Sequence, residues 1–327
     1  MIMVTMKVVL GVLFLGLLAE PRQELIREED KSIHEQGVLI AKEFYFLDEG
    51  LEFKELTQAI LESAETEESV RDQILATGRR FFLFTYPSDG FRVKGTLSFL
   101  PDSEESSLLV FLRGGNKMFG LKHPATDLTC AHPYTVITTT YRGGVSEGKD
   151  EYGGVEVNDI QNLIDFFPKL QEKIGVHFSP KKKFILGRSR GGMEMFLALS
   201  RSMALQNQFH KAVSLSGPLD FEDCLANYED YRMMMIKEFG LKPGENEESW
   251  IASRNPVANV STLRKDLPIL IRQGTEDLRV GLNEGVKMVN TLKENGNVVT
   301  YIEIEGGNHC LDNQPNRMEM ITKWLEE

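Results

Sequence analysis

The chain has 327 residues, of which 41% are hydrophobic and 26% charged, a composition typical of a globular protein with room for one large domain or two. Its net charge of −12 and the lack of a basic stripe argue against nucleic-acid binding. The three cysteines, Cys130, Cys224 and Cys310, have unrelated spacings that fit neither a metal site nor a disulfide framework.

The first 19 residues resemble a targeting segment. Val8 to Ala19 is an apolar run preceded by Lys7 and followed by a charged stretch. A span of the bilayer takes ~20 residues, so this run is too short to cross it but fits the apolar part of a signal peptide. We therefore expect export or membrane tethering, with a weak cleavage site. A buried helix in a cytoplasmic protein is the alternative.

Residues 20–80 form an acidic segment that we expect to be a small helical appendage. It holds 16 acidic and 8 basic residues, and its charge fits a solvated face. Leu56, Ala59 and Ile60 have helical spacing, and Thr66 and Gly78 fit the N-cap and C-cap of a second helix.

The main domain is expected over residues 81–327. Two strands, 81–87 and 91–100, are joined by the hairpin signal Ser88-Asp89-Gly90. Further apolar strands follow in alternation with amphipathic helices, at 108–112, 134–141, 184–186, 211–216, 267–274 and 298–304. This rhythm predicts an α/β fold with a mostly parallel, doubly wound sheet. Residues 221–263 interrupt it and are expected to form a lid-like helical insertion.

The most informative motif is Gly187-Arg188-Ser189-Arg190-Gly191, which lies between an expected strand and an expected helix. This context is that of a nucleophile elbow, in which the glycines let strand and helix pass closely around a strained serine. A serine hydroxyl needs a base and an orienting acid. The sequence offers both: Asp277 follows one later strand and His309 follows the next.

The order Ser189, Asp277, His309 is that of the α/β-hydrolase fold. We expect Ser189 to attack an acyl carbon, His309 to act as general base, and Asp277 to orient the imidazole. No metal or organic cofactor is expected.

From about residue 81 onward, the chain resembles the catalytic domain of the prolyl oligopeptidase family. The resemblance rests on the elbow and on several further stretches, which are 88–97, Tyr141-Arg142-Gly143-Gly144 with Asp159, Ser253-Arg254-Asn255-Pro256, 274–280 and Gly306-Gly307-Asn308-His309. It implies the same roles for Ser189, Asp277 and His309.

The sequence departs from the family pattern in two respects. The segment 20–80 has roughly sixty residues, too few for the β-propeller of the family's peptidases, which needs at least four sheets. Where members commonly have Tyr or His before a glycine pair, this chain has Arg113-Gly114-Gly115-Asn116. We expect an oxyanion hole built from the N–H of Arg190 and an N–H of Gly115 or Asn116. Arg113 is either a further substrate or oxyanion contact or a structural residue.

The sequence thus predicts a serine hydrolase acting on a small ester or a short peptide. Two alternatives stay open: a catalytically silent binding protein with the same fold, which the complete triad disfavours, and an acyltransferase, which the same triad would support.

Overall fold

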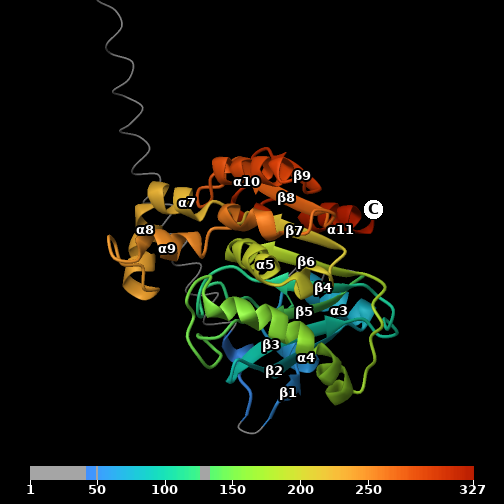
Figure 1. The fold of residues 1–327 in the computed structure, drawn as a ribbon. Coiled ribbons are helices and arrows are strands. Elements are labelled where there is room, and N and C mark those ends of the chain that lie inside the picture. The colour runs from blue at the N-terminus through green and yellow to red at the C-terminus, as the bar shows by residue number, and fades with distance from the viewer. Residues whose placement is uncertain (1–41, 49–50, 126–132) are drawn as a thin grey trace, which may run out of the picture.

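The computed structural model describes residues 42–48, 51–125 and 133–327. The signal-like segment 1–19, residues 20–41 and 49–50 of the acidic segment, and residues 126–132 with Cys130 lie outside these residues. All nine strands described belong to one sheet, whose order is β1-β2-β3-β5-β4-β6-β7-β8-β9 (Figure 1). The strands from β5 to β9 run parallel, and β1, β2 and β3 pair antiparallel at one edge. This confirms the predicted α/β-hydrolase architecture.

The strand bounds agree with the sequence pattern to within a few residues. They are β1 Phe53–Glu55, β2 Arg80–Ser88, β3 Phe91–Phe99, β4 Leu108–Leu112, β5 Thr135–Thr139, β6 Lys183–Arg188, β7 Lys211–Leu215, β8 Ile269–Gly274 and β9 Val299–Ile304. The hairpin between β2 and β3 turns on Asp89 and Gly90, which both have positive φ (47° and 86°). Two such residues are what a type I′ turn requires.

Helices cover both faces of the sheet. Alternate residues of β4 face opposite sides: Leu108, Val110 and Leu112 pack with one face, and Leu109 and Phe111 with the other. The first face is covered by α4 (Asn158–Ile174), α5 (Arg190–Arg201) and α10 (Leu282–Glu294), and the second by α11 (Arg317–Glu326) together with α2 (Thr57–Glu62) and α3 (Glu68–Thr77). The central strands are therefore buried on both sides, as their uninterrupted apolar runs require.

The N-terminal segment is only partly helical. The short strand β1 extends the sheet by pairing with β2, which the sequence analysis does not predict. Gly78 ends α3 in the left-handed conformation (φ 67°), as expected. The prediction for Thr66 is wrong: α3 begins at Glu68, and the Thr66 hydroxyl instead donates to the carbonyl of Ile60 at 2.6 Å.

The interruption at 221–263 is a group of helices, α7 (Phe221–Asn227), α8 (Glu229–Glu238) and α9 (Glu247–Ala252), followed by the 3₁₀ turn η3 (Val257–Thr262). Figure 1 shows α7, α8 and α9 grouped at the edge of the molecule. Aromatic contacts hold the group together and join it to the main domain, through Phe221, Tyr231, Phe239 and Trp250 around Tyr152. Within the described ranges, no helix has the length and apolar character needed to cross a membrane.

Candidate active site

The strand β6 and the helix α5 meet in a sharp turn at Ser189. Its backbone has φ 53° and ψ −129°, a region that a residue with a side chain seldom adopts. Such strain persists only where the surrounding structure enforces it and is concentrated at functional sites. The predicted strained elbow is therefore present at Ser189.

Two glycines make this turn sterically feasible. A Cβ atom on Gly187 would lie 2.1 Å from the carbonyl oxygen of Gly191, and one on Gly191 would lie 2.1 Å from the carbonyl oxygen of Leu112. Real Cβ contacts are never so short, so neither position accommodates a side chain without displacing backbone. The glycine spacing of the motif thus follows from the close approach of α5 to β6 and β4.

The loops after β8 and β9 bring Asp277 and His309 to the elbow. The Nε2 atom of His309 lies 2.9 Å from Ser189 Oγ, and its Nδ1 atom lies 3.0 and 2.9 Å from the two carboxylate oxygens of Asp277. Asp277 also accepts hydrogen bonds from the backbone N–H groups of Arg279 and Val280 and from Gln273 Nε2. The structure thus joins the three predicted residues in one hydrogen-bonded chain.

The charges at the site favour an ionised acid and a basic imidazole. Burial would raise the pKa of Asp277, but hydrogen bonds from His309 and from two backbone N–H groups outweigh it and lower that pKa. Burial would lower the pKa of His309, but Cys310 and Asp277 outweigh it and raise that pKa above its ordinary value. Burial alone would raise the pKa of the Cys310 thiol, but His309 and Arg188 outweigh it and lower that pKa to about 7.

The loop after β4 runs against the nucleophile. A Cβ atom on Gly114 would lie 2.8 Å from Cβ and 3.3 Å from Oγ of Ser189, so the backbone of this loop is in contact with the serine. This contact of Gly114 with the nucleophile is not predicted from the sequence, where only the glycine pair Gly114-Gly115 indicates a tightly packed loop. Gly115 has φ 71°, and a Cβ there would lie 2.1 Å from the carbonyl oxygen of Phe119.

Arg113 is the first residue of this loop, and its side chain is buried. Its guanidinium donates to the carbonyl oxygens of Gly114, Lys117, Phe119 and Thr140, at distances from 2.6 to 3.2 Å. These bonds direct the guanidinium at the backbone of the loop, an arrangement that fits a structural residue better than a substrate contact.

Arg190 is the first residue of α5, so its backbone N–H has no intrahelical acceptor and is available for an oxyanion. Its side chain is almost fully buried and binds three carboxylates, those of Asp150, Glu156 and Glu194. This cluster is not predicted from the sequence, because Asp150 and Glu156 are 40 and 34 positions away from Arg190 in the chain.

The helix α8 lies over the loop after β4. Asn116 Nδ2 is 3.3 Å from Met234 Sδ, and the Lys117 ammonium forms a half-exposed ion pair with Glu238 at 2.8 Å. Lys117 also lies over the ring of Phe239. The insertion therefore borders the site, as expected for a lid.

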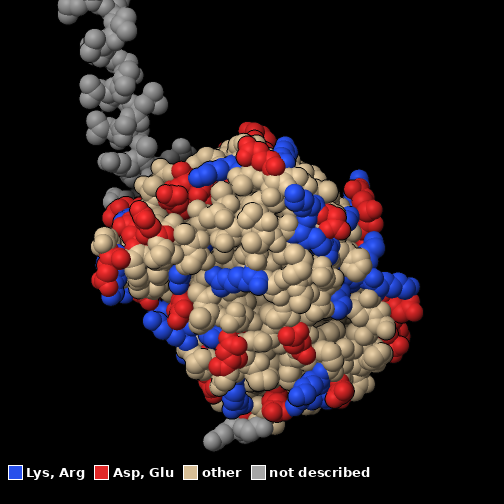
Figure 2. All heavy atoms as spheres, in the orientation of Figure 1, with Lys and Arg blue, Asp and Glu red and all other residues tan. Residues whose placement is uncertain are grey.

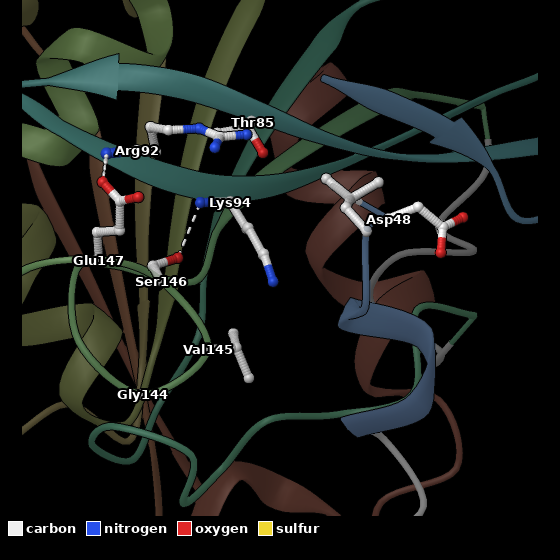
Figure 3. Close-up of a pocket in the computed structure, with 9 residues that line it drawn as sticks. Asp48, Thr85, Arg92, Lys94, Gly144, Val145, Ser146 and Glu147 are labelled. Carbon is white, nitrogen blue, oxygen red and sulfur yellow. Dashed lines mark hydrogen bonds between the residues drawn. The ribbon is translucent and has the colours of Figure 1, made fainter. Parts of the chain in front are cut away.

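A separate hollow of about 360 Å³ is lined by residues 47–48, which follow the 3₁₀ turn η1 (Glu43–Tyr45), by residues of β2 and β3, and by the loop 144–147. Figure 3 shows the Lys94 side chain pointing into it, where its ammonium donates to the carbonyl of Tyr45 at 2.7 Å. None of the three triad residues lines this hollow. On the face drawn in Figure 2, acidic and basic side chains are interspersed.

The histidine His123 lies away from the triad. It packs edge-on against Phe44 and contacts the Thr66 hydroxyl at 3.2 Å, and burial lowers its pKa to about 4. Its partners belong to the N-terminal segment, so its environment is that of a packing residue.

The fold and the site define a serine hydrolase of the α/β-hydrolase class. The chain belongs to the prolyl oligopeptidase family, whose sequence profile matches residues 127–327. This membership confirms the resemblance and identifies the protein as a peptidase-like serine hydrolase.

Several known proteins are similar to this chain over most of its length or over part of it. It is 26% identical over 255 residues to the uncharacterized peptidase YtmA of Bacillus subtilis, covering 76% of this chain and 93% of that one. It is 25% identical to the acylamino-acid-releasing enzyme of Arabidopsis thaliana, of which it spans 24%. Among solved structures, acylaminoacyl peptidase of Pyrococcus horikoshii superposes with a TM-score of 0.62 at 21% identity, over 75% of this chain and 41% of that one.

Proposed function

We propose that the protein hydrolyses a small ester or a short peptide through an acyl-enzyme on Ser189. The observation that carries this proposal is the relay from Ser189 Oγ to His309 Nε2 and from His309 Nδ1 to Asp277, with distances of 2.9 to 3.0 Å. In this reaction, His309 takes the hydroxyl proton as Oγ attacks the acyl carbon, then gives it to the leaving group. Water attacks the acyl-enzyme in the second half, with the same histidine as base.

The developing oxyanion would lie between two backbone donors. The N–H of Arg190 is one, and the loop Gly114–Asn116 would supply the other, because it is in contact with Ser189. Loss of one such donor typically costs about 10²–10³ in kcat.

The surroundings of the site support compact substrates. The helix α8 contacts the loop after β4 through Met234 and Glu238. The insertion would therefore occupy the space into which a long peptide substrate would extend. Two relatives are named acylamino-acid-releasing enzyme and dipeptidyl aminopeptidase, and these names support an acyl or short peptide substrate here. A catalytically silent binding protein would not need a strained serine within hydrogen-bond distance of a histidine that is paired with a carboxylate. An acyltransferase differs only in its acceptor.

A fluorophosphonate probe tests the proposal directly. We expect it to label the protein at Ser189, with labelling lost in Ser189→Ala and strongly slowed in His309→Ala. Because Ser214 is a buried serine on the neighbouring strand, Ser214→Ala serves as the matched control and should label at a rate close to that of the parent. Equal labelling of Ser189→Ala and the parent would exclude the acyl-enzyme.

A further inference from the structure

The side chain of Arg190 occupies an unusual position for a residue next to a nucleophile. It is 1% exposed, and each of its five N–H groups has an acceptor. Nε donates to Glu194 at 2.8 Å, Nη2 to Asp150 and Glu156 at 2.8 and 2.7 Å, and Nη1 to Asp150 at 2.8 Å. The remaining bond runs from Nη1 to the carbonyl oxygen of Gly115 at 3.1 Å.

This last bond reaches the loop that faces Ser189. The peptide between Gly115 and Asn116 is planar and trans, so a carbonyl held in one direction fixes the N–H of Asn116 in the opposite one. Among the residues the structure describes, none accepts a hydrogen bond from that N–H. It is therefore a donor whose orientation is set and whose acceptor is left open.

Asp150 binds the next peptide of the loop, the one between Asn116 and Lys117. One of its oxygens, Oδ2, accepts both from Arg190 Nη1 and from the backbone N–H of Lys117, each at 2.8 Å. The Arg190–Asp150 pair thus binds the loop immediately before and immediately after Asn116. Both side chains are buried, and Arg190 also lies 4.3 Å from the ring centroid of Tyr152, so the pair has little freedom to shift.

We propose that Arg190 is a positioning residue for the oxyanion hole, in which its side chain, together with Asp150, orients the N–H of Asn116 as the second donor. One residue would then serve both halves of the hole, with its own backbone N–H as the first donor and its guanidinium as the support of the other. This inference rests on the proposed function and goes beyond it, since it selects Asn116 over Gly115 and assigns a role to a side chain that does not touch the substrate.

The test compares Arg190→Lys with Glu194→Gln. Lysine keeps the positive charge but cannot bind Gly115, Asp150 and the two glutamates at once. Glu194 belongs to the same cluster but does not contact the loop. Glutamine keeps an oxygen that can accept from Arg190 Nε and removes only the charge, so it provides a matched control.

The measurements are kcat and KM for p-nitrophenyl butyrate and Ki for a trifluoromethyl ketone, which forms a tetrahedral oxyanion adduct. We expect Arg190→Lys to lower kcat by about 10- to 100-fold and to raise Ki by a similar factor, with KM within about threefold. Glu194→Gln should change each value by less than about threefold. A merely structural role would change Tm in both variants without separating Ki from KM.

Three results would overturn the inference. One is a folded Arg190→Lys variant with unchanged kcat and Ki. Another is an equal loss in Glu194→Gln. The third is a loss confined to Arg113→Lys, which would assign the donor to Gly115, since Arg113 holds the preceding carbonyl of Gly114 at 2.9 Å.

A crystal structure of Arg190→Lys keeps the test independent of the proposed function. We expect the Gly115–Asn116 peptide to rotate in this variant, and an unchanged peptide overturns the inference whether or not the enzyme is active. Failure of the proposed function would instead be seen in the parent protein, as absence of probe labelling at Ser189.

Discussion

The guanidinium of Arg188 binds both carboxylate oxygens of Asp312, at 2.7 and 2.5 Å. Arg188 directly precedes the nucleophile, and Asp312 lies three residues after His309. The pair therefore connects the strand that carries the serine to the loop that carries its base. Arg317 binds Asp312 as well, so the carboxylate has two cationic partners.

We expect Asp312→Asn to lower kcat roughly threefold to tenfold. Loss of the ion pair between Arg188 and Asp312 would let the His309 loop shift. A displacement of about 1 Å at a catalytic group can lower the rate by up to ~10²-fold. Steady-state kinetics with p-nitrophenyl butyrate provide the measurement. Glu326→Gln is the control, because Glu326 pairs with Lys182 at the exposed surface and should change kcat less than twofold. Equal kinetics for Asp312→Asn and the parent would show that the pair does not position the loop.

The pH dependence of kcat/KM should reflect His309. The reaction needs the neutral imidazole, so activity rises as the proton is lost, and a raised pKa moves the midpoint of this rise above the ordinary ~6.5. Because Cys310 contributes to the raised pKa, Cys310→Ser should move the midpoint to lower pH while retaining activity. A midpoint that stays in place would show that the thiol does not influence the histidine.

Removing members of the triad should have much larger effects. His309→Ala and Asp277→Asn should each lower kcat by roughly three to four orders of magnitude. His123→Ala is the matched control, since this histidine packs against the N-terminal segment through Phe44 and Thr66 and should affect stability more than kcat. Near-full activity of His309→Ala would require another base.

The sheet and the triad could be predicted because their signals are local. Short apolar runs mark the buried strands, and Ser189, Asp277 and His309 each follow a strand, at the sheet edge where the carboxyl ends of parallel strands meet. The glycines on either side of Ser189 predicted the sharp turn that carries the nucleophile. The short strand β1 escaped prediction, because three residues, Phe53–Glu55, carry no usable period.

The Arg190 cluster could not be predicted for a different reason. Asp150 is separated from Arg190 by 40 positions, and charged residues are seldom fully buried, so the sequence favours reading them as surface groups. The contact between α8 and the loop after β4 also joins residues that are distant in the sequence, since Asn116 and Met234 are separated by 118 positions. Both depend on tertiary packing that no local pattern encodes.

The glycines of the elbow provide a steric test. We expect Gly191→Ala to destabilise the protein by about 3 kcal/mol or more, because its Cβ would lie 2.1 Å from a backbone oxygen of β4. In Gly240→Ala the new Cβ has nothing within 4 Å and only the positive φ of 84° is unfavourable, so a cost of about 1–2 kcal/mol is expected. Urea unfolding of both variants measures the difference. Similar losses would contradict the close approach of α5 and β4.

The insertion should decide between small and extended substrates. An endopeptidase must bind several residues on both sides of the scissile bond, whereas α8 here lies against the loop after β4 through Met234 and Glu238. A compact acyl group can obtain its binding energy from a short pocket without an extended groove. We therefore expect a higher kcat/KM for p-nitrophenyl butyrate, or for substrates of one to three residues, than for an internally quenched decapeptide.

The same comparison in Glu238→Gln tests whether α8 sets this preference. Its ion pair with Lys117 is half-exposed, so the substitution should affect stability little but let α8 move from the loop. We expect the ratio of ester to decapeptide kcat/KM to fall by roughly twofold to fivefold, while Glu245→Gln, which removes an exposed pair within the insertion, should leave it unchanged. Faster internal cleavage of the decapeptide than of the ester by the parent protein would contradict the small-substrate proposal and favour an oligopeptidase.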